Sequence, residues 1–458
     1  MRIVILGAGQ VGASVAEALA SEANDVTIVD YDPKALGALA DKLDVRTVVG
    51  NGASPAVMRQ AGMDDAELLV AVTQSDQTNL VACKVAKALF NTPTRVARLR
   101  AADFHAEAVL MNDENFAVSH AMCPEQDVTE YIARLIDFPP ALQVLTFADG
   151  KVTLVGLLAR TDSIWVKRTI RELRARLPAD LDARIAAVFR QHKPVAPEGD
   201  TVIEVGDEVF MLAASAQIHQ LMTLIRPQQK PFHRIMIVGG GNIGLRVAKA
   251  LEKDHEVKLI ELHPGRAELI AGQLSRTLVL TGEATDEAML EEESIDEMDM
   301  FLALTNDDES NIMAASLAKR LGCPRVLALI NRRAYADMVQ GGPIDIGMSP
   351  AQVSIGSLLA YVRQGDVAQV HSLRRGAAEA LELVVRGDAK TSKVVGRRIE
   401  ELPVIGTARI AAIVRGDTVI IPHHDTVIQT DDHVVVFCTK KREVRKVEKL
   451  FQVGFHFF

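Results

Sequence analysis

The feature that most constrains this 458-residue chain is an internal repeat. The segment RIVILGAGQVGASVAEALA at residues 2–20 reappears as RIMIVGGGNIGLRVAKALE at residues 234–252. The same spacing aligns Asn79 with Asn311, far beyond the matching segment, so the duplication covers a whole domain. A repeat of this kind determines how the rest of the chain must be divided, because each copy is one folding unit.

A second, shorter repeat follows the first one. DTVIEVGDEVF at residues 200–210 is echoed by DTVIQTDDHVV at residues 425–435. The order along the chain is therefore large unit, small unit, large unit, small unit, which agrees with the usual domain size of about 100 to 200 residues. We expect the four units to span 1–123, 141–227, 232–348 and 368–453, with Pro- and Gly-containing linkers near 123–140, 227–231 and 341–350.

The two kinds of unit have different patterns. In each large unit, short apolar runs alternate with helical segments, which predicts a doubly wound, Rossmann-type α/β domain whose parallel sheet is covered on both faces. In the first copy the expected strands are 3–6, 26–30, 47–49, 68–73 and 94–99. The small units contain hairpin signals at 144–160 and 410–421, which predict small α+β lobes.

The first glycine motif follows a predicted strand and opens a predicted helix. Gly7, Gly9 and Gly12 form G-x-G-x-x-G, which permits a tight turn, close approach of a pyrophosphate and close packing of helix on sheet. Asp30 ends the second strand, where a carboxylate can accept hydrogen bonds from ribose hydroxyls. Since Tyr31 and Asp32 follow, with no arginine for a ribose phosphate, the motif favours NAD(H) over NADP(H).

The second copy keeps the same glycine pattern. Gly239, Gly241 and Gly244 are followed by Glu261 at the end of the next strand, which predicts a second adenine-nucleotide site. The alternative is a degenerate copy retained for packing, because glutamate is longer than aspartate and Ala284 stands where the first copy has a glycine.

Polar pairs end the fourth strand of both copies. Thr73-Gln74 and Thr305-Asn306 lie where the ligands of such sheets collect, at the carboxyl edge. The alternative is ordinary capping of the helices that begin near Thr78 and Ser310.

Arg98 ends the fifth strand of the first copy and could reach the phosphates of a cofactor. The alternative for Arg98 is a surface ion pair. The second copy offers Ala328 or Ile330 at this place, so a role in phosphate binding is confined to the first site.

Composition excludes other functions. The net charge of −9 opposes nucleic-acid binding, which depends on clustered lysine and arginine. The four cysteines have no metal-ligand spacing, so we expect neither a metal site nor disulfides, and a reducing cytosol suits such thiols. No apolar run has the length of a membrane span, and the start of the chain has no signal-peptide pattern. We expect the single tryptophan, Trp165, to be packed in a core.

The motifs GAGQVG, VVGNGASP, AVTQSDQTNLVACKVAKALF and IVGGGNIG, in this domain order, resemble the TrkA family of bacterial Trk potassium-uptake systems over the full chain. The resemblance implies tandem RCK domains, each with a nucleotide-binding half and a TrkA-C half. It also implies NAD or NADH binding with ATP or ADP as possible modulators. A further implication is a homotetrameric ring on the cytoplasmic face of the inner membrane, beneath a TrkH- or TrkG-type membrane partner.

The resemblance and the glycine motifs together identify the candidate cofactor-binding residues. At the first site these are Gly7, Ala8, Gly9, Gln10, Val11, Gly12, Asp30, Thr73, Gln74 and Arg98. At the second site they are Gly239, Gly240, Gly241, Asn242, Ile243, Gly244, Glu261, Thr305 and Asn306.

Two other functions are compatible with a dinucleotide motif. An NAD-dependent dehydrogenase needs a proton donor or base beside the nicotinamide, and the sequence offers no obvious candidate. Two complete dinucleotide sites in one chain suit a sensor better than a catalyst, so we expect no enzymatic activity. The remaining alternative is an RCK regulator of a different ion channel or antiporter.

Overall fold

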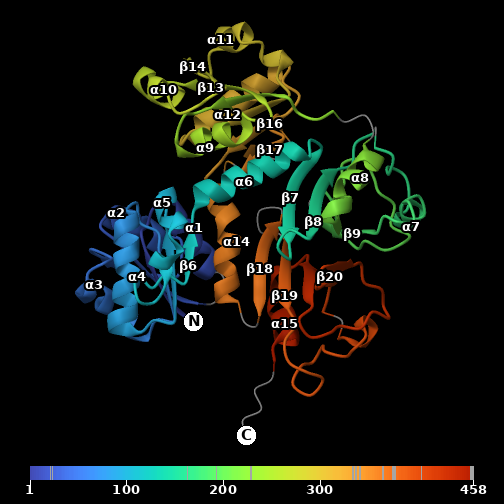
Figure 1. Cartoon of the computed structure of the whole chain (residues 1–458), viewed down its shortest axis with the longest axis horizontal. Helices are drawn as coiled ribbons and strands as arrows, with labels where there is room; N and C mark the ends of the chain where they lie inside the picture. Colours follow the sequence, from blue (N-terminus) through green and yellow to red (C-terminus); the bar gives the residue numbers. More distant parts are fainter. Residues whose placement is uncertain are drawn as a thin grey trace.

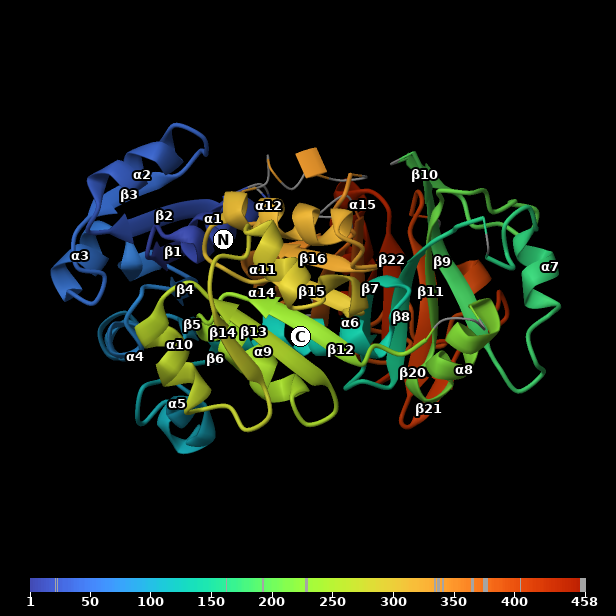
Figure 2. The same ribbon diagram turned by 90° about the horizontal axis from the view of Figure 1, so that it is seen from above.

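The computed structural model describes residues 1–453 except 21, 23, 162, 192, 227–229, 333–334, 336–337, 340–341, 364–365, 374–377 and 404. It contains two six-stranded and two five-stranded sheets, which alternate along the chain (Figure 1). We call the units N-domain 1 (2–122), C-lobe 1 (141–225), N-domain 2 (234–348) and C-lobe 2 (367–451). The two C-lobes lie together at one end of the molecule (Figure 2).

N-domain 1 has the parallel strand order β3-β2-β1-β4-β5-β6, which confirms the doubly wound fold. The strand order reverses between β1 and β4. Ligands of such sheets bind at this switch point, beyond the carboxyl ends of the strands. The edge strand β6 was not predicted. The elements are β1 (Arg2–Leu6), α1 (Gln10–Ala20), β2 (Asp25–Asp30), α2 (Pro33–Ala40), β3 (Arg46–Val49), α3 (Pro55–Gln60), β4 (Leu68–Ala71), α4 (Asp76–Phe90), β5 (Thr94–Arg98), α5 (Ala102–Ala106) and β6 (His120–Met122).

N-domain 2 repeats this topology with the order β14-β13-β12-β15-β16-β17, again with parallel pairs. The repeat seen in the sequence is therefore a repeat of the fold. The elements are β12 (Arg234–Val238), α9 (Asn242–Leu251), β13 (Glu256–Glu261), α10 (Pro264–Ala271), β14 (Leu278–Thr281), α11 (Glu287–Glu292), β15 (Met300–Ala303), α12 (Asp308–Arg320), β16 (Val326–Leu329) and β17 (Ile346–Met348).

The C-lobes are small antiparallel sheets with few helices, as the hairpin signals predicted. C-lobe 1 contains β7 (Ala141–Phe147), β8 (Val152–Leu158), α7 (Ile170–Arg174), β9 (Ala183–Arg190), β10 (Lys193–Val195), β11 (Glu208–Ala214) and α8 (Ser215–Ile225). C-lobe 2 contains β18 (Val367–Leu373), β19 (Ala378–Val384), β20 (Arg409–Arg415), β21 (Thr418–Ile420), β22 (His433–Cys438) and α15 (Lys441–Phe451).

The second sequence repeat builds the same buried ion pair in each lobe. Asp207 is fully buried and accepts two hydrogen bonds from Arg190, both at 2.9 Å. In C-lobe 2, the fully buried Asp432 accepts two from Arg415, both at 2.8 Å. A bidentate arginine on a buried carboxylate is a strong and directional contact, which explains why these residues recur together.

The expected linkers at 123–140 and 341–350 are wrong. The first is mostly the helix α6 (Pro124–Asp137), and the second runs through β17 into the helix α14 (Pro350–Val362). Proline at the first helical turn starts both helices, because its fixed φ suits that position. Proline therefore marks the beginning of a helix at both places and not a break in regular structure. The third expected linker, 227–231, lies mostly outside the described residues.

These two helices exchange partners between the repeats. Helix α14 packs on α1 of N-domain 1, α6 packs on α9 of N-domain 2, and α6 and α14 contact each other (Figure 1). Val15 of α1 and Leu359 of α14 belong to one continuous apolar core. The two halves of the chain are therefore joined by buried apolar surface rather than by chain connectivity alone.

The remaining expectations concern cysteines, tryptophan and membranes. All four cysteines are buried and unbridged, and the described residues contain no group of side chains arranged to hold a metal ion. Trp165 is buried, as predicted. Among the described helices, none has both the length and the apolar character of a transmembrane span.

Candidate functional site

The first glycine loop connects β1 to α1 and has the geometry that each glycine predicts. Gly7 has φ of +107°, a left-handed conformation that favours glycine. A Cβ on Gly12 would lie 1.8 Å from the carbonyl oxygen of Gly7, so helix and loop are in direct contact there. A Cβ on Gly9 would meet nothing within 4 Å. The loop therefore leaves open space above Gly9 at the start of α1, where unpaired helix amides attract anions.

Asp30 lies at the end of β2 and faces this loop. One carboxylate oxygen accepts a hydrogen bond from the Ala8 amide at 2.6 Å, and the other accepts one from the Asp32 amide at 2.9 Å. Each carboxylate oxygen has a further lone pair, so both stay able to accept from a ligand hydroxyl. The structure thus brings the predicted glycine loop and the predicted acid together at one edge of the sheet.

The second glycine loop repeats the backbone but not the surroundings. Gly239 has φ of +97°, and a Cβ on Gly244 would lie 1.9 Å from the Gly239 carbonyl oxygen. Glu261 is 8% exposed and accepts from the Gly240 amide at 2.7 Å. Arg266 of α10 donates to the Gly240 carbonyl oxygen at 2.8 Å. This site therefore has a buried acid and a cation on the loop, neither of which the first site has.

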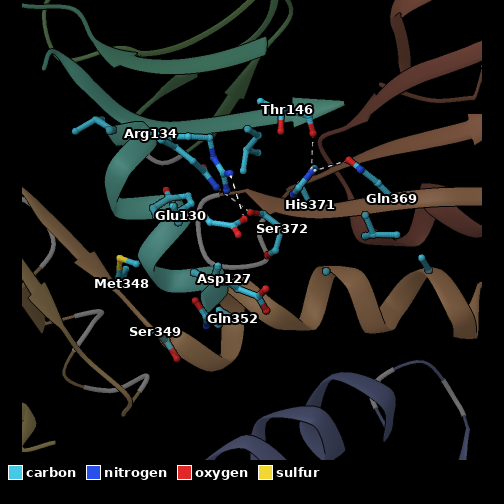
Figure 3. Close-up of a pocket in the computed structure, with 18 of the residues that line it drawn as sticks. Asp127, Glu130, Arg134, Thr146, Met348, Ser349, Gln352, Gln369, His371 and Ser372 are labelled. Atoms are coloured by element: carbon cyan, nitrogen blue, oxygen red, sulfur yellow. Dashed lines mark hydrogen bonds and ion pairs between the residues drawn. The ribbon is translucent and has the colours of Figure 1, made fainter. Parts of the chain in front are cut away.

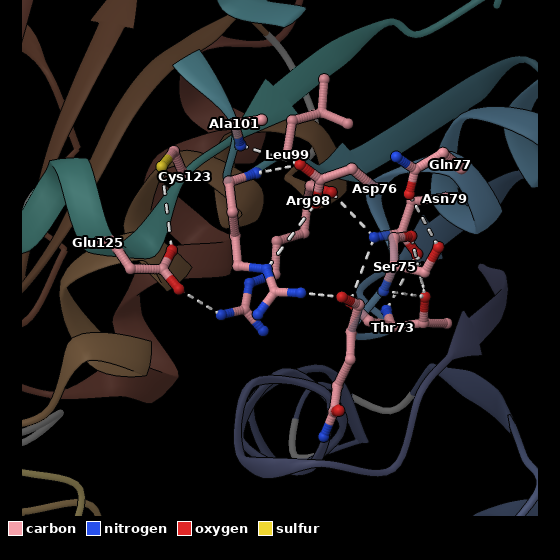
Figure 4. Close-up of polar contacts among 12 residues, drawn as sticks. Thr73, Ser75, Asp76, Gln77, Asn79, Arg98, Leu99, Ala101, Cys123 and Glu125 are labelled. Atoms are coloured by element: carbon pink, nitrogen blue, oxygen red, sulfur yellow. Dashed lines mark hydrogen bonds and ion pairs between the residues drawn. The ribbon is translucent and has the colours of Figure 1, made fainter. Parts of the chain in front are cut away.

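The strand-end threonines are not helix caps. Thr73 donates its hydroxyl proton to the Asn79 side-chain oxygen at 2.7 Å, and the Asn79 amide group donates to the Arg98 carbonyl oxygen at 2.8 Å (Figure 4). Asn79 is fully buried. The cap of α4 is Ser75, whose hydroxyl accepts from the Thr78 amide at 3.1 Å. Thr73 and Asn79 thus tie the end of β4 to the end of β5.

The same arrangement recurs in N-domain 2. Thr305 donates to Asn311 at 2.7 Å, and Asn311 donates to the Leu329 carbonyl oxygen at 2.9 Å. Asp307 caps α12 through the Ser310 amide at 2.7 Å. Asn79 and Asn311 occupy aligned positions of the repeat. The alignment alone did not predict that each would donate a hydrogen bond to the end of the neighbouring strand.

Arg98 pairs with a carboxylate on the connecting helix. Its guanidinium donates to Glu125 of α6 at 2.6 Å, with side chains 16% and 9% exposed (Figure 4). The pair is therefore partly buried and differs from the surface ion pair considered as the alternative. In this arrangement Arg98 links the carboxyl edge of N-domain 1 to α6.

Asp76 and Arg100 were missed by the sequence reading. Asp76 is 7% exposed and accepts from the amides of Arg100 and Ala101 at 2.8 and 2.9 Å. Arg100 donates to the carbonyl oxygen of Gln74, one of the predicted site residues. The signal for Asp76 was its recurrence as Asp308, which accepts from two backbone amides in the same way.

A cavity of about 610 Å³ lies at this edge. Residues of α9, which belongs to the other half of the chain, form one of its walls. Arg246 of α9 lies in its wall and donates to the Arg100 carbonyl oxygen at 2.6 Å. Asn242, predicted for the second site, also lines this cavity beside the first. The helix that begins at the second glycine loop therefore forms a wall of this cavity, which shares Gln74 with the candidate residues of the first site. The sequence did not predict this contact.

Another cavity, of about 690 Å³, lies between α6, α14, β7 and β18 (Figure 3). Its lining contains acidic, basic and imidazole side chains: Asp127 and Arg134 on α6, and His371 on β18. Burial raises the pKa of Asp127 and lowers the pKa of His371 to about 4. His371 contacts the Thr146 carbonyl oxygen at 3.1 Å, so the cavity lies on the seam between the halves.

Comparison with known proteins agrees with the repeat. The TrkA-N domain model matches residues 3–119 and 235–350, and the TrkA-C domain model matches 154–226 and 388–452. The Trk system potassium uptake protein TrkA of Halomonas elongata is 50% identical over 458 residues, covering 100% of both chains. That of Vibrio alginolyticus is 51% identical over 453 residues, covering 99% of both.

Solved structures share the fold at low identity. The GsuK RCK domain aligns with a TM-score of 0.63 at 18% identity, covering 98% of this chain and 94% of that one. The GsuK channel aligns with a TM-score of 0.64 at 19% identity, covering 98% and 78%. From two domain models, full-length relatives at half identity and a shared RCK fold, the chain belongs to the TrkA family of Trk-system potassium uptake proteins.

Proposed function

We propose that this chain is the NAD(H)-binding, nucleotide-gated regulatory subunit of a Trk-type potassium uptake system. It would control transport through a membrane-embedded TrkH- or TrkG-type partner. The observation that carries the proposal is the open glycine loop at Gly9, with Asp30 facing it from β2. Loop amides and the start of α1 suit a pyrophosphate, and the carboxylate suits a ribose hydroxyl.

The names of similar proteins support the same assignment. Relatives at about half identity are named as potassium uptake proteins of the Trk system. One structure with the same fold is described as the GsuK channel bound to NAD, and another as GsuK bound to ADP. We therefore propose NAD or NADH as the principal ligand, with ATP or ADP as possible modulators.

The candidate ligand residues divide into contact and support roles. Gly7, Gly9 and Asp30 form the proposed contact surface of the first site, with Ala8, Gln10, Val11 and Gly12 of the same loop and helix. Thr73 and Gln74 border it, and Arg98 supports its edge through Glu125. The second site uses the equivalent loop 239–244 with Glu261, bordered by Thr305 and Asn306.

We also propose the boundaries and the assembly. The RCK N-terminal halves would span 1–123 and 232–348, and the TrkA-C halves 141–227 and 368–453. Four chains would form a ring that binds as a peripheral subunit to the cytoplasmic face of the inner membrane.

Regulation without catalysis is the expected mode of action. A nucleotide can shift the chain between two shapes only by binding one of them more tightly, and couplings of about 1–3 kcal/mol are typical. Helices α6 and α14 contact both halves of the chain, so a change at either nucleotide site can reach both C-lobes.

The test is calorimetry of NAD, NADH, ATP and ADP on the full chain and on Gly9→Val. Since a Cβ at Gly9 would meet nothing within 4 Å, we expect the variant to fold normally while its side chain blocks the approach of a pyrophosphate. We expect the affinity for NADH at the first site to fall by at least tenfold. In cells, potassium uptake through the partner should lose its nucleotide response.

A matched variant, Gly241→Val, makes the same change in the second loop, where a Cβ also has open space. It should leave the first site intact. Unaltered, normally regulated uptake in Gly9→Val cells would contradict the proposed regulation. Turnover of NADH with a metabolite would support the dehydrogenase alternative instead.

A further inference from the structure

A third cavity, of about 450 Å³, lies in C-lobe 1 between its sheet and the helices α7 and α8. Residues 409, 411 and 421 of C-lobe 2 complete its wall, so the cavity touches both lobes. Its volume is within the usual range of small-molecule pockets, roughly 300–1,000 Å³. Its walls are mostly apolar and include Trp165, Ile185, Met211, Leu221, Ile225 and Ile421.

Two of the apolar residues that line this cavity are exposed to solvent. Ile164 and Leu224 both line it, and they are 42% and 37% exposed. Exposed large apolar side chains beside a concave apolar wall are typical of a ligand entrance.

The charged residues of the cavity are all of one sign. Five arginines line it, and no acidic side chain does so among the described residues: Arg171, Arg174, Arg176, Arg184 and Arg409. Arg171 pairs with Asp200 at 2.9 Å outside the cavity. Arg184 is held in place by donating to the carbonyl oxygens of Ile410 and Pro422.

Two of these arginines repel each other. Burial, and then the positive charge of Arg174, lower the pKa of Arg184. A like-charge pair in a partly buried site is stabilised by an anion placed between its members. The guanidinium groups also supply several donors in a geometry that suits carboxylate, sulfate or phosphate oxygens.

Trp165 forms part of the cavity wall. Its side chain is 1% exposed, and its ring nitrogen is buried without a hydrogen-bond acceptor among the described residues. An indole N–H can only donate, and buried donors in native proteins nearly always have an acceptor. Because this nitrogen has almost no accessible surface, a ligand in the cavity would contact the face or edge of the ring rather than the N–H.

We propose that this cavity of C-lobe 1 binds a small amphiphilic anion, a molecule with an apolar body and one acidic head group. The apolar walls pack against the apolar body, and the arginines at 174, 176 and 184 bind the acidic head group. The cavity has no glycine loop and no carboxylate for a ribose, so its ligand class differs from that of the N-domains. The proposal does not depend on nucleotide binding.

The test uses Trp165 as its own reporter, because it is the single tryptophan of the chain. Bromine quenches indole fluorescence only at contact. We would titrate the full chain with 11-bromoundecanoate below its micelle concentration, and with the neutral 11-bromoundecanol as a matched ligand. We expect saturable quenching by the carboxylate, and at least tenfold weaker binding of the alcohol.

A charge reversal locates the head group. In Arg174→Glu/Arg176→Glu, both changed residues are exposed, so the fold should hold and the dissociation constant for the carboxylate should rise at least tenfold. Lys253→Glu, an exposed cation of N-domain 2, should leave it unchanged.

Three results would overturn the proposal. The first is no quenching by the free carboxylate up to its solubility, and the second is equal quenching by acid and alcohol. The third is quenching only by vesicles that contain brominated anionic lipid, because the occupant would then be a membrane surface. The comparison of acid with alcohol uses the unmodified chain, so it decides the question even if the double variant fails to fold.

Discussion

The two N-domains present the same glycine loop in different surroundings. Gly7 and Gly239 share a positive φ, and in both loops the third glycine touches the carbonyl oxygen of the first. In the second loop, however, the acid is longer and buried, and Arg266 holds the loop carbonyl. The duplication has therefore kept the backbone of the loop proposed to receive a phosphate, while the side chains around it have diverged. The two sites should bind the same class of ligand with different affinity.

A second difference lies at the carboxyl edges. The edge of N-domain 1 is closed by Arg246 of α9, which belongs to the other half of the chain. The equivalent position of α1 is Ser14, which has no guanidinium to donate. The cavity beside the first site is thus lined partly by the second domain, which predicts an asymmetric coupling between the two sites.

The largest loss of stability should come from substitutions of the third glycine of each loop, because neither loop has room there for a Cβ. In Gly12→Ala and Gly244→Ala, the new Cβ would lie 1.8 or 1.9 Å from a carbonyl oxygen, so the loop must move. We expect each variant to lose more than about 4 kcal/mol or to fail to fold. Thermal unfolding with a dinucleotide titration measures both effects.

The matched controls are Gly9→Ala and Gly241→Ala, where a Cβ has open space. These should change stability by less than about 1 kcal/mol. If Gly244→Ala were tolerated and Gly12→Ala were not, the second loop would have lost the constraint that the comparison assigns to both.

The next effect tests the buried asparagines. Asn79→Ala would leave the Thr73 amide and the Arg98 carbonyl without their partner, and Asn311→Ala would do the same in N-domain 2. Unsatisfied buried polar groups cost about 1–3 kcal/mol each, so we expect each variant to lose about 2–4 kcal/mol. Chemical denaturation measures this loss.

Gln77→Ala is the control, because Gln77 is exposed at the same helix and should cost less than about 0.5 kcal/mol. Unequal losses in Asn79→Ala and Asn311→Ala would mean that the two edges are not held alike.

Sequence reasoning recovered the fold because periodicity and repetition are local signals. The glycine loop, Asp30 and the hairpins follow from residues within about 30 positions of one another. Because proline often breaks regular structure, although it also starts helices, the sequence predicts a linker where α6 lies and another that ends at Pro350, the first residue of α14. Their apolar faces pack on the opposite repeat, and no pattern within the chain indicates that partner.

The sequence predicted the residues of the site whose own side chain or backbone would contact a ligand. It did not predict the residues that hold the strand ends in place. Asp76, Asn79 and Arg100 bind backbone atoms of distant loops, so their role appears only when β4 and β5 are placed side by side. Arg246 is about 150 positions along the chain from Arg100, whose carbonyl oxygen it contacts. A repeat alignment does show that Asp76 and Asn79 recur, and the recurrence of a buried polar residue is a usable signal.

A smaller effect should show the coupling between the halves. Arg246→Ala removes the donor to the Arg100 carbonyl oxygen, and with it part of the wall of the cavity beside the first site. We expect nucleotide affinity at the first site to change by about 1–2 kcal/mol, roughly 5- to 30-fold, although the residue belongs to N-domain 2. Calorimetry on the Gly241→Val background, where only the first site binds, measures this change.

Ser14→Ala makes the equivalent change in α1 and should alter affinity at the second site by less than twofold. Equal effects of the two substitutions would contradict the asymmetry. No effect of Arg246→Ala would show that α9 is only a neighbour of the first site and not part of it.

The smallest effect concerns the seam between the lobes, where the repeats differ again: His371 of β18 stands at the position that Leu145 holds in β7. Burial lowers the pKa of His371 to about 4, so the folded chain keeps it neutral while the unfolded chain takes up a proton near pH 6.5. Stability should therefore be full above pH 6.5 and fall as the pH drops towards 4, by roughly 1 kcal/mol between pH 6.5 and 5.5. His371→Leu, which makes the two lobes alike at this position, should remove that part of the slope in denaturation curves at the two pH values. An unchanged slope would place the acid sensitivity at groups other than His371. Asp127 is not one of them, because its raised pKa means that the folded form binds the proton more tightly and gains stability as the pH falls.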